Sequence, residues 1–182
     1  GLAWVLTLTA IAEVAYLTIQ AARGRHSHWN FETKFESLMY AGMGVGAVIM
    51  ILVAAVIGLL VYRYPVRKMG QGLRLGILLG MVLGFITTLI VAGYMSSQNS
   101  HWVGGVPSDA DGLPIVGWAR GGGDLRVPHF FATHLMQIIP LIGWMADRYS
   151  QRPTRIVIAA STIGVSAVAA TFIQALSGQP FI

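Results

Sequence analysis

Long apolar segments limit what this chain can fold into more than any other feature. The hydrocarbon core of a bilayer is about 30 Å thick, and a helix needs about 20 apolar residues to cross it. Segments of this kind lie at about 2–22, 38–62, 73–95, 129–146 and 156–176. We therefore predict an all-α, polytopic membrane helix bundle of about five transmembrane helices, formed as a single domain over residues 1–182.

The charged residues are few and sit at the segment ends. Only 10% of the residues are charged, against about 25% in a soluble domain. The basic residues form no patch or stripe, so we expect the lipid bilayer and not nucleic acid as the partner. The chain has no Cys, which excludes thiolate metal sites and Cys nucleophiles. No Ser lies in a nucleophile elbow, so a Ser-His-Asp hydrolase is not supported, and whether the protein is an enzyme stays open.

The Lys and Arg residues of the loops predict the orientation. Basic residues are more frequent in cytoplasmic loops. The second-to-third and fourth-to-fifth loops share one side and carry the larger set, which is Arg63, Arg67, Lys68, Arg74, Arg148, Arg152 and Arg155. We therefore expect the chain to start on the cytoplasmic side and end outside. The loops at about 23–37 and 96–128 then face outward and carry most of the histidines.

Polar side chains gather near this predicted outer surface. A glycine-rich stretch from Gly121 leads into the fourth segment, which carries His129, His134 and Gln137. Such side chains are unfavourable in a bilayer, so they indicate function. The residues that we assign to one outward-facing pocket, as cofactor ligands, are His129, His134, Gln137, His101, Glu13 and Gln20.

Imidazole groups suit zinc, copper and haem iron, and the predicted occupant is one of these metals, haem or another redox cofactor. On a regular helix, His129 and His134 point about 140° apart, so by themselves they hold neither one metal ion nor one haem. A metal or haem site of His129 and His134 therefore needs a further ligand, which would be His101, His28 or a residue of the first segment such as Glu13, and we assign His101 as the third metal ligand.

The first segment carries a polar stripe. Thr9, Glu13, Tyr16 and Gln20 recur at helical spacing, which puts them on one helix face. A carboxyl facing lipid would be unpaired, so the stripe should face protein or a wet cavity. Two interpretations remain open. Either the stripe lines a functional cavity, or it joins helices while Glu13 is protonated.

Two further features have packing interpretations. Asp124 either orients a histidine through a ring nitrogen or pairs with Arg126 inside the turn. Glycines at intervals of four form a groove for close helix contact, and they are Gly72, Gly76, Gly80 and Gly84. The groove also supports an alternative function. The chain would then be a non-catalytic accessory subunit of a larger membrane protein or pigment–protein complex, docking through this glycine-rich helix and the outer loop.

Several motifs resemble those of a family of uncharacterised multi-pass bacterial membrane proteins. The most specific is Gly123-Asp-Leu-Arg-x-x-His-Phe-x-x-x-His-x-x-Gln137, and the segments Ser27-His-Trp-Asn-x-x-Thr33, Gln98–His101 and Gly112-Leu-Pro with Trp118 add to it. The resemblance covers most of the chain. It implies a multi-pass protein of the bacterial cytoplasmic membrane with an outward polar loop, and it implies no activity or cofactor.

Overall fold

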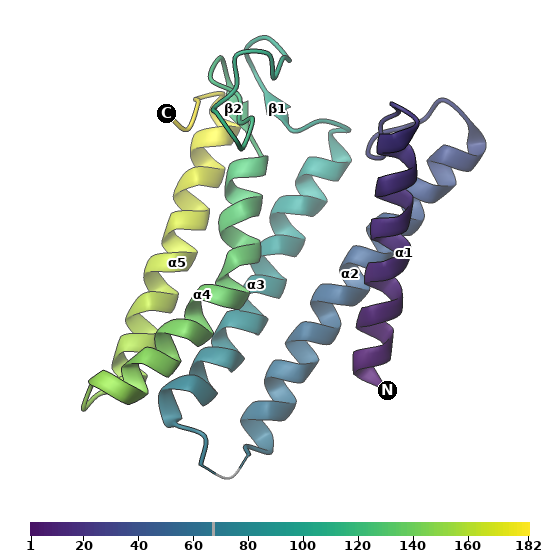
Figure 1. Cartoon of the computed structure of the whole chain (residues 1–182). Coiled ribbons are helices and arrows are strands. Elements are labelled where there is room, and N and C mark those ends of the chain that lie inside the picture. Colours follow the sequence, from purple (N-terminus) through teal and green to yellow (C-terminus); the bar gives the residue numbers. More distant parts are fainter. Residues whose placement is uncertain (67) are drawn as a thin grey trace. The chain divides into compact units, whose positions relative to one another are not determined.

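The computed structural model describes residues 1–66 and 68–182, and helices dominate it (Figure 1). The helices are α1 (Leu2–Ala22), α2 (Lys34–Arg63), α3 (Gln71–Ser97), α4 (Arg126–Tyr149) and α5 (Pro153–Leu176). Two short strands, β1 (Trp102–Val103) and β2 (Gly123–Asp124), pair antiparallel between α3 and α4. The predicted all-α fold is confirmed, with helix ends that differ by a few residues from the predicted ones.

Four of the described helices, α1, α2, α3 and α5, are long and apolar enough to cross a membrane. The remaining helix, α4, has 24 residues and a length of about 36 Å at 1.5 Å per residue. Its length suffices, but it carries the charged Arg126, Asp147 and Arg148 in addition to histidines. Its crossing of the membrane therefore stays a prediction. Arg67, one of the basic residues used for the orientation, lies outside the described residues.

The chain divides into two compact units, Gly1–Ile57 and Gly58–Ile182. In the second unit, α4 packs against both α3 and α5, and α3 also contacts α5 (Figure 1). The apolar core of this unit consists of Val91, Ala132, Leu135, Ile139, Val157 and Val168. A single domain over the whole chain stays a prediction.

The glycine-rich face of α3 is covered by α4. Gly72, Gly76, Gly80 and Gly84 are all buried. A Cβ atom on Gly76 would lie 2.8 Å from the carbonyl oxygen of Ile139, and one on Gly80 would lie 2.9 Å from that of Leu135. The two helix backbones can approach so closely only because these side chains are absent. The groove is therefore filled within this chain, so it is not a free docking surface for another subunit.

One carboxylate joins the end of α4 to the start of α3. Asp147, near the end of α4, accepts hydrogen bonds of 2.7 Å each from the backbone N–H groups of Gly72 and Leu73. These N–H groups belong to the first turn of α3, which has no carbonyl partners of its own. The negative charge also lies at the positive end of the helix dipole. Asp147 thus caps α3 from a distant part of the chain.

In the first unit, a loop joins α1 to α2 and is fixed by polar contacts. The hydroxyl of Thr33 accepts the N–H of Glu36 at 3.1 Å and donates to its carboxylate at 3.0 Å. This places Thr33 as the capping residue of α2. Arg25 pairs with the same carboxylate at 2.8 Å. The loop therefore holds the adjoining ends of the two helices in register.

Candidate functional site

The segment between α3 and α4, residues 98–125, forms a folded cap on the second unit. Trp102 of β1 stands opposite Asp124 of β2, and the N–H of Leu125 donates to the carbonyl oxygen of His101 at 2.8 Å. At Gly123, any Cβ atom would collide with the carbonyl oxygen of Ala175 at the end of α5. The hairpin thus brings His101 next to Asp124, and its β2 strand packs against the end of α5.

Asp124 is the buried centre of the cap, with a residue exposure of 1%. Its Oδ2 accepts the N–H of Ala119 at 2.8 Å, and its Oδ1 accepts the N–H of Arg126 at 2.9 Å. The Arg126 side chain adds an ion pair of 2.7 Å. Of the two alternatives for Asp124, pairing within the turn is the one that the contacts support.

Arg126 also reaches a second carboxylate. Its Nη2 lies 2.6 Å from Oδ1 of Asp109, and its Nη1 lies 3.2 Å from Oδ2. Nη2 further donates to the carbonyl oxygen of Gly117 at 2.8 Å. One guanidinium therefore bridges Asp109 and Asp124, and the planar fork of arginine suits such a double contact.

His101 lies on the other side of Asp109. Its Nε2 is 3.4 Å from Oδ1 of Asp109, and its ring lies 3.9 Å from the Trp102 ring. Burial lowers the pKa of His101, the charge of Arg126 lowers it further, and the hydrogen bond to Asp109 opposes both. The neutral imidazole that results keeps a lone pair on one ring nitrogen.

Asp109 is the accessible member of this group. Its side chain is 40% exposed, whereas that of Asp124 is fully buried. Burial alone would raise the pKa of Asp109, but hydrogen bonds from Arg126 and then from His101 bring it below its ordinary value. Asp109 is therefore an anion at neutral pH, with one edge open to solvent.

Within residues 1–66 and 68–182, the side chains spaced to share a metal ion are His101, Asp109 and Asp124. One ligand atom from each lies within 4.8 Å of the others. We call these three residues the cap triad. The sequence predicts His101 as a ligand, but it predicts no role for Asp109, and it predicts Asp124 as the partner of a histidine or of Arg126 and not as a metal ligand.

The other predicted ligands on α4 do not join the cap triad. Nδ1 of His134 lies 2.7 Å from the carbonyl oxygen of Phe130. A carbonyl only accepts, so Nδ1 carries the proton and the free lone pair is on Nε2. His129 lies in the first turn of α4, and Gln137 is exposed two turns further on. Their roles as cofactor ligands stay predictions.

The two predicted ligands of the first unit, Gln20 and Glu13, differ in their surroundings. Gln20 is fully buried, and its Nε2 donates to the Tyr16 hydroxyl at 3.1 Å and to the His26 carbonyl oxygen at 3.3 Å. Its amide donors are thus engaged in holding the loop. Glu13 lines a groove that faces α2. The polar stripe of α1 therefore faces the groove beside α2, and the two interpretations of the stripe stay predictions.

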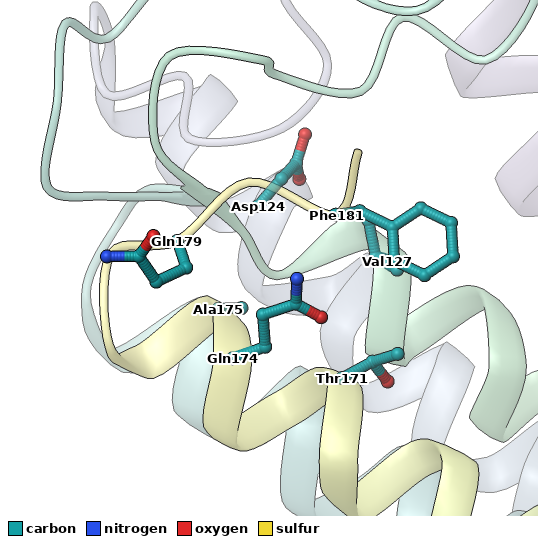
Figure 2. Close-up of a pocket in the computed structure, with 7 residues that line it drawn as sticks. All are labelled: Asp124, Val127, Thr171, Gln174, Ala175, Gln179 and Phe181. Carbon is teal, nitrogen blue, oxygen red and sulfur yellow. The ribbon is translucent and has the colours of Figure 1, made fainter.

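Figure 2 shows a cleft where the segment after α5 folds over the start of α4. Its walls include Val127, Gln174 and Phe181, and Asp124 lies at its edge. The amide of Gln174 donates to the carbonyl oxygen of Pro180 at 2.6 Å, which ties this segment down. The cleft leaves no room for a water molecule. Solvent therefore reaches the cap triad at Asp109 and not through this cleft.

We compared the chain with protein-family models, with curated proteins and with solved structures, and none of the three comparisons gives a match.

Proposed function

We propose that this membrane protein binds one divalent transition-metal ion, of the zinc class, at the cap triad. The observation that carries the proposal is the spacing of the ligand atoms of His101, Asp109 and Asp124. Bonds from zinc to imidazole nitrogen and carboxylate oxygen are about 2.0–2.2 Å long, so two ligands of one tetrahedral ion lie about 3.4 Å apart. Nε2 of His101 and Oδ1 of Asp109 are 3.4 Å apart.

The donor set selects the class of metal. One imidazole and two carboxylates suit zinc or another borderline ion, and copper(I) and iron–sulfur clusters would need sulfur ligands. Calcium and magnesium prefer sites made of oxygen alone. The lowered pKa of His101 keeps its imidazole neutral, which is the form that binds a metal ion. The exposed edge of Asp109 leaves space for water as the fourth ligand.

Arg126 is the competitor of the metal ion. In the structure its guanidinium contacts both Asp109 and Asp124. A divalent ion would take over the Asp109 contact first, because that side chain is exposed while Asp124 is buried. The expected affinity is therefore lower than that of a dedicated structural zinc site, in which no cation has to be displaced.

Zinc titration of the full-length, metal-stripped protein in detergent tests this function. We expect one zinc ion per chain, read by calorimetry and by elemental analysis after dialysis. Asp109→Asn keeps the size of the side chain and removes a ligand charge, so the affinity should fall by about tenfold or more. Asp111→Asn is the matched control, because Asp111 is an exposed acid of the same cap outside the triad. Equal affinities for the two variants, or no stoichiometric zinc, would refute the proposal.

A further inference from the structure

A groove in the first unit contains polar side chains that lie inside a predicted span. It runs between α1 and α2 and has a volume of about 120 Å³. Its lining consists of Thr9, Ala12, Glu13, Tyr16, Met39, Gly42, Met43 and Gly46. For comparison, an apolar cavity of about 150 Å³ accommodates a benzene molecule. The groove is somewhat smaller than that cavity, so it suits an organic molecule no larger than benzene.

Glu13 supplies the only acidic group among the lining residues. It lies about 14 Å from the end of α1, close to the middle of the helix, at 1.5 Å per residue. Its Oε2 is buried and has no hydrogen-bond partner among the described residues. A carboxylate at such a depth is unfavourable unless a positive charge or a proton accompanies it.

The remaining polar groups of the groove are few. The Thr9 hydroxyl donates to the carbonyl oxygen of Val5 at 2.8 Å, and the Tyr16 hydroxyl accepts from Gln20 at 3.1 Å. A hard metal ion would need about six to eight oxygen ligands, more than these side chains provide. The other walls are apolar or formed by glycine. Such walls suit a ligand with a hydrocarbon surface.

We infer that the groove binds a small organic cation of the alkylammonium class, with Glu13 as its counter-charge. The positive nitrogen lies against the free oxygen of Glu13, and the Tyr16 ring adds a face that attracts cations. The alkyl groups lie against Met39 and Met43, whose flexible thioether side chains adapt to irregular shapes. This site is independent of the cap triad.

Two glycines of α2 provide a matched pair of variants. A Cβ atom on Gly42 or on Gly44 would meet nothing within 4 Å. Gly42 lines the groove and Gly44 does not. Gly42→Val therefore adds side-chain volume to the groove from a Cβ atom that has free space, while Gly44→Val makes the same chemical change outside the groove. Gly46 is unsuitable, because a Cβ atom there would lie 3.1 Å from Thr9.

The test is binding of isotope-labelled tetramethylammonium to the full-length protein in detergent, measured by equilibrium dialysis. Tert-butanol, a neutral molecule of similar shape, is the competitor. We expect saturable binding that tert-butanol does not displace. Glu13→Gln should weaken it about tenfold or more, because the opposite charge is lost in a partly dry site. Gly42→Val should weaken it too, and Gly44→Val should not.

Three results would overturn the inference. They are the absence of saturable binding, displacement by tert-butanol at equal concentration, and equal binding by the Gly42→Val and Gly44→Val proteins. Met43→Leu keeps the volume of the wall and removes a sulfur atom. Tetramethylammonium binding should survive this change, because the wall contributes apolar contact and not a sulfur ligand. If the Glu13→Gln protein does not fold, the comparison of Gly42→Val with Gly44→Val still shows whether the ligand binds in the groove.

Discussion

Nε2 of His101 lies 3.4 Å from Oδ1 of Asp109, a residue eight positions further along the same irregular loop segment. The contact exists because β1 and β2 pair and place His101 beside Asp124, while Arg126 draws Asp109 toward the same point. The strand pairing and the ion pairs of Arg126 thus bring His101, Asp109 and Asp124 close together. The proposed metal site and the stability of the cap both depend on this arrangement.

Replacing Arg126 should expose the competition between arginine and metal. Arg126→Gln leaves Asp124 buried without its countercharge, and loss of one partner of a buried ion pair costs about 3–5 kcal/mol. Because the competing cation is removed as well, zinc should restore much of the lost cap stability. Limited proteolysis of the cap, with and without zinc, measures this. Arg120→Gln is the control, since Arg120 is exposed in the same segment. If zinc does not reduce the proteolysis of the cap in the Arg126→Gln protein, the proposed metal site is contradicted.

The metal-free cap should weaken as the pH falls. Folding lowers the pKa of His101 below its ordinary value of 6.5, chiefly through burial. The unfolded cap therefore binds the proton more readily, so stability is present above pH 6.5 and is lost progressively below it. Asp109 adds the same trend below pH 3.8. Amide exchange of the cap, corrected for intrinsic rates, should show less protection at pH 5 than at pH 7. His101→Gln should flatten this dependence, and an unchanged slope would show that another group is responsible.

Close contact between α3 and α4 should depend on Gly76. A Cβ atom there would lie 2.8 Å from the carbonyl oxygen of Ile139, so Gly76→Ala forces the two backbones apart. Overpacking of this kind costs about 1–3 kcal/mol. Gly93→Ala is the matched change on the same helix, since nothing lies within 4 Å of that position. Thermal unfolding followed by circular dichroism should give a clearly lower melting temperature for Gly76→Ala than for Gly93→Ala. Equal melting temperatures would argue against the packing.

Asp147 should act as a cap for α3. Asp147→Asn replaces one acceptor oxygen by a donor, which then faces the N–H of Gly72 or Leu73. Loss of such a cap costs about 0.5–2 kcal/mol. The same melting experiment should show this decrease, with faster amide exchange confined to the first turn of α3. Uniform loss of protection over the whole chain would instead indicate general misfolding.

The sequence predicts the helices well because a membrane-spanning helix must be apolar over most of its length. Each membrane span needs a continuous apolar segment, and four of the predicted spans meet that criterion in the structure. The interval of four between Gly76 and Gly80 predicts close packing, although not that α4 of the same chain would fill the groove. Periodicity reveals a face of a helix, but it does not reveal which helix will cover it.

The candidate site is harder to predict because it lies in irregular structure. His101 stands out as a histidine at the start of a loop, but Asp109 is one of several loop acids. Its role depends on turns that include Ile115 with a φ of +74°, a conformation that β-branched residues rarely adopt. Asp147 is a similar case, since its partners Gly72 and Leu73 are distant in sequence. Only the folded chain brings these groups together.

X-ray absorption at the zinc edge of the loaded, full-length protein tests the central claim most directly. We expect a first shell of one imidazole nitrogen and carboxylate or water oxygens at about 2.0–2.2 Å. The imidazole signal should disappear in His101→Gln and persist in His134→Gln, because His134 lies outside the cap triad. A shell of water oxygens alone, or an imidazole signal that follows His134 and not His101, would contradict the proposed metal site.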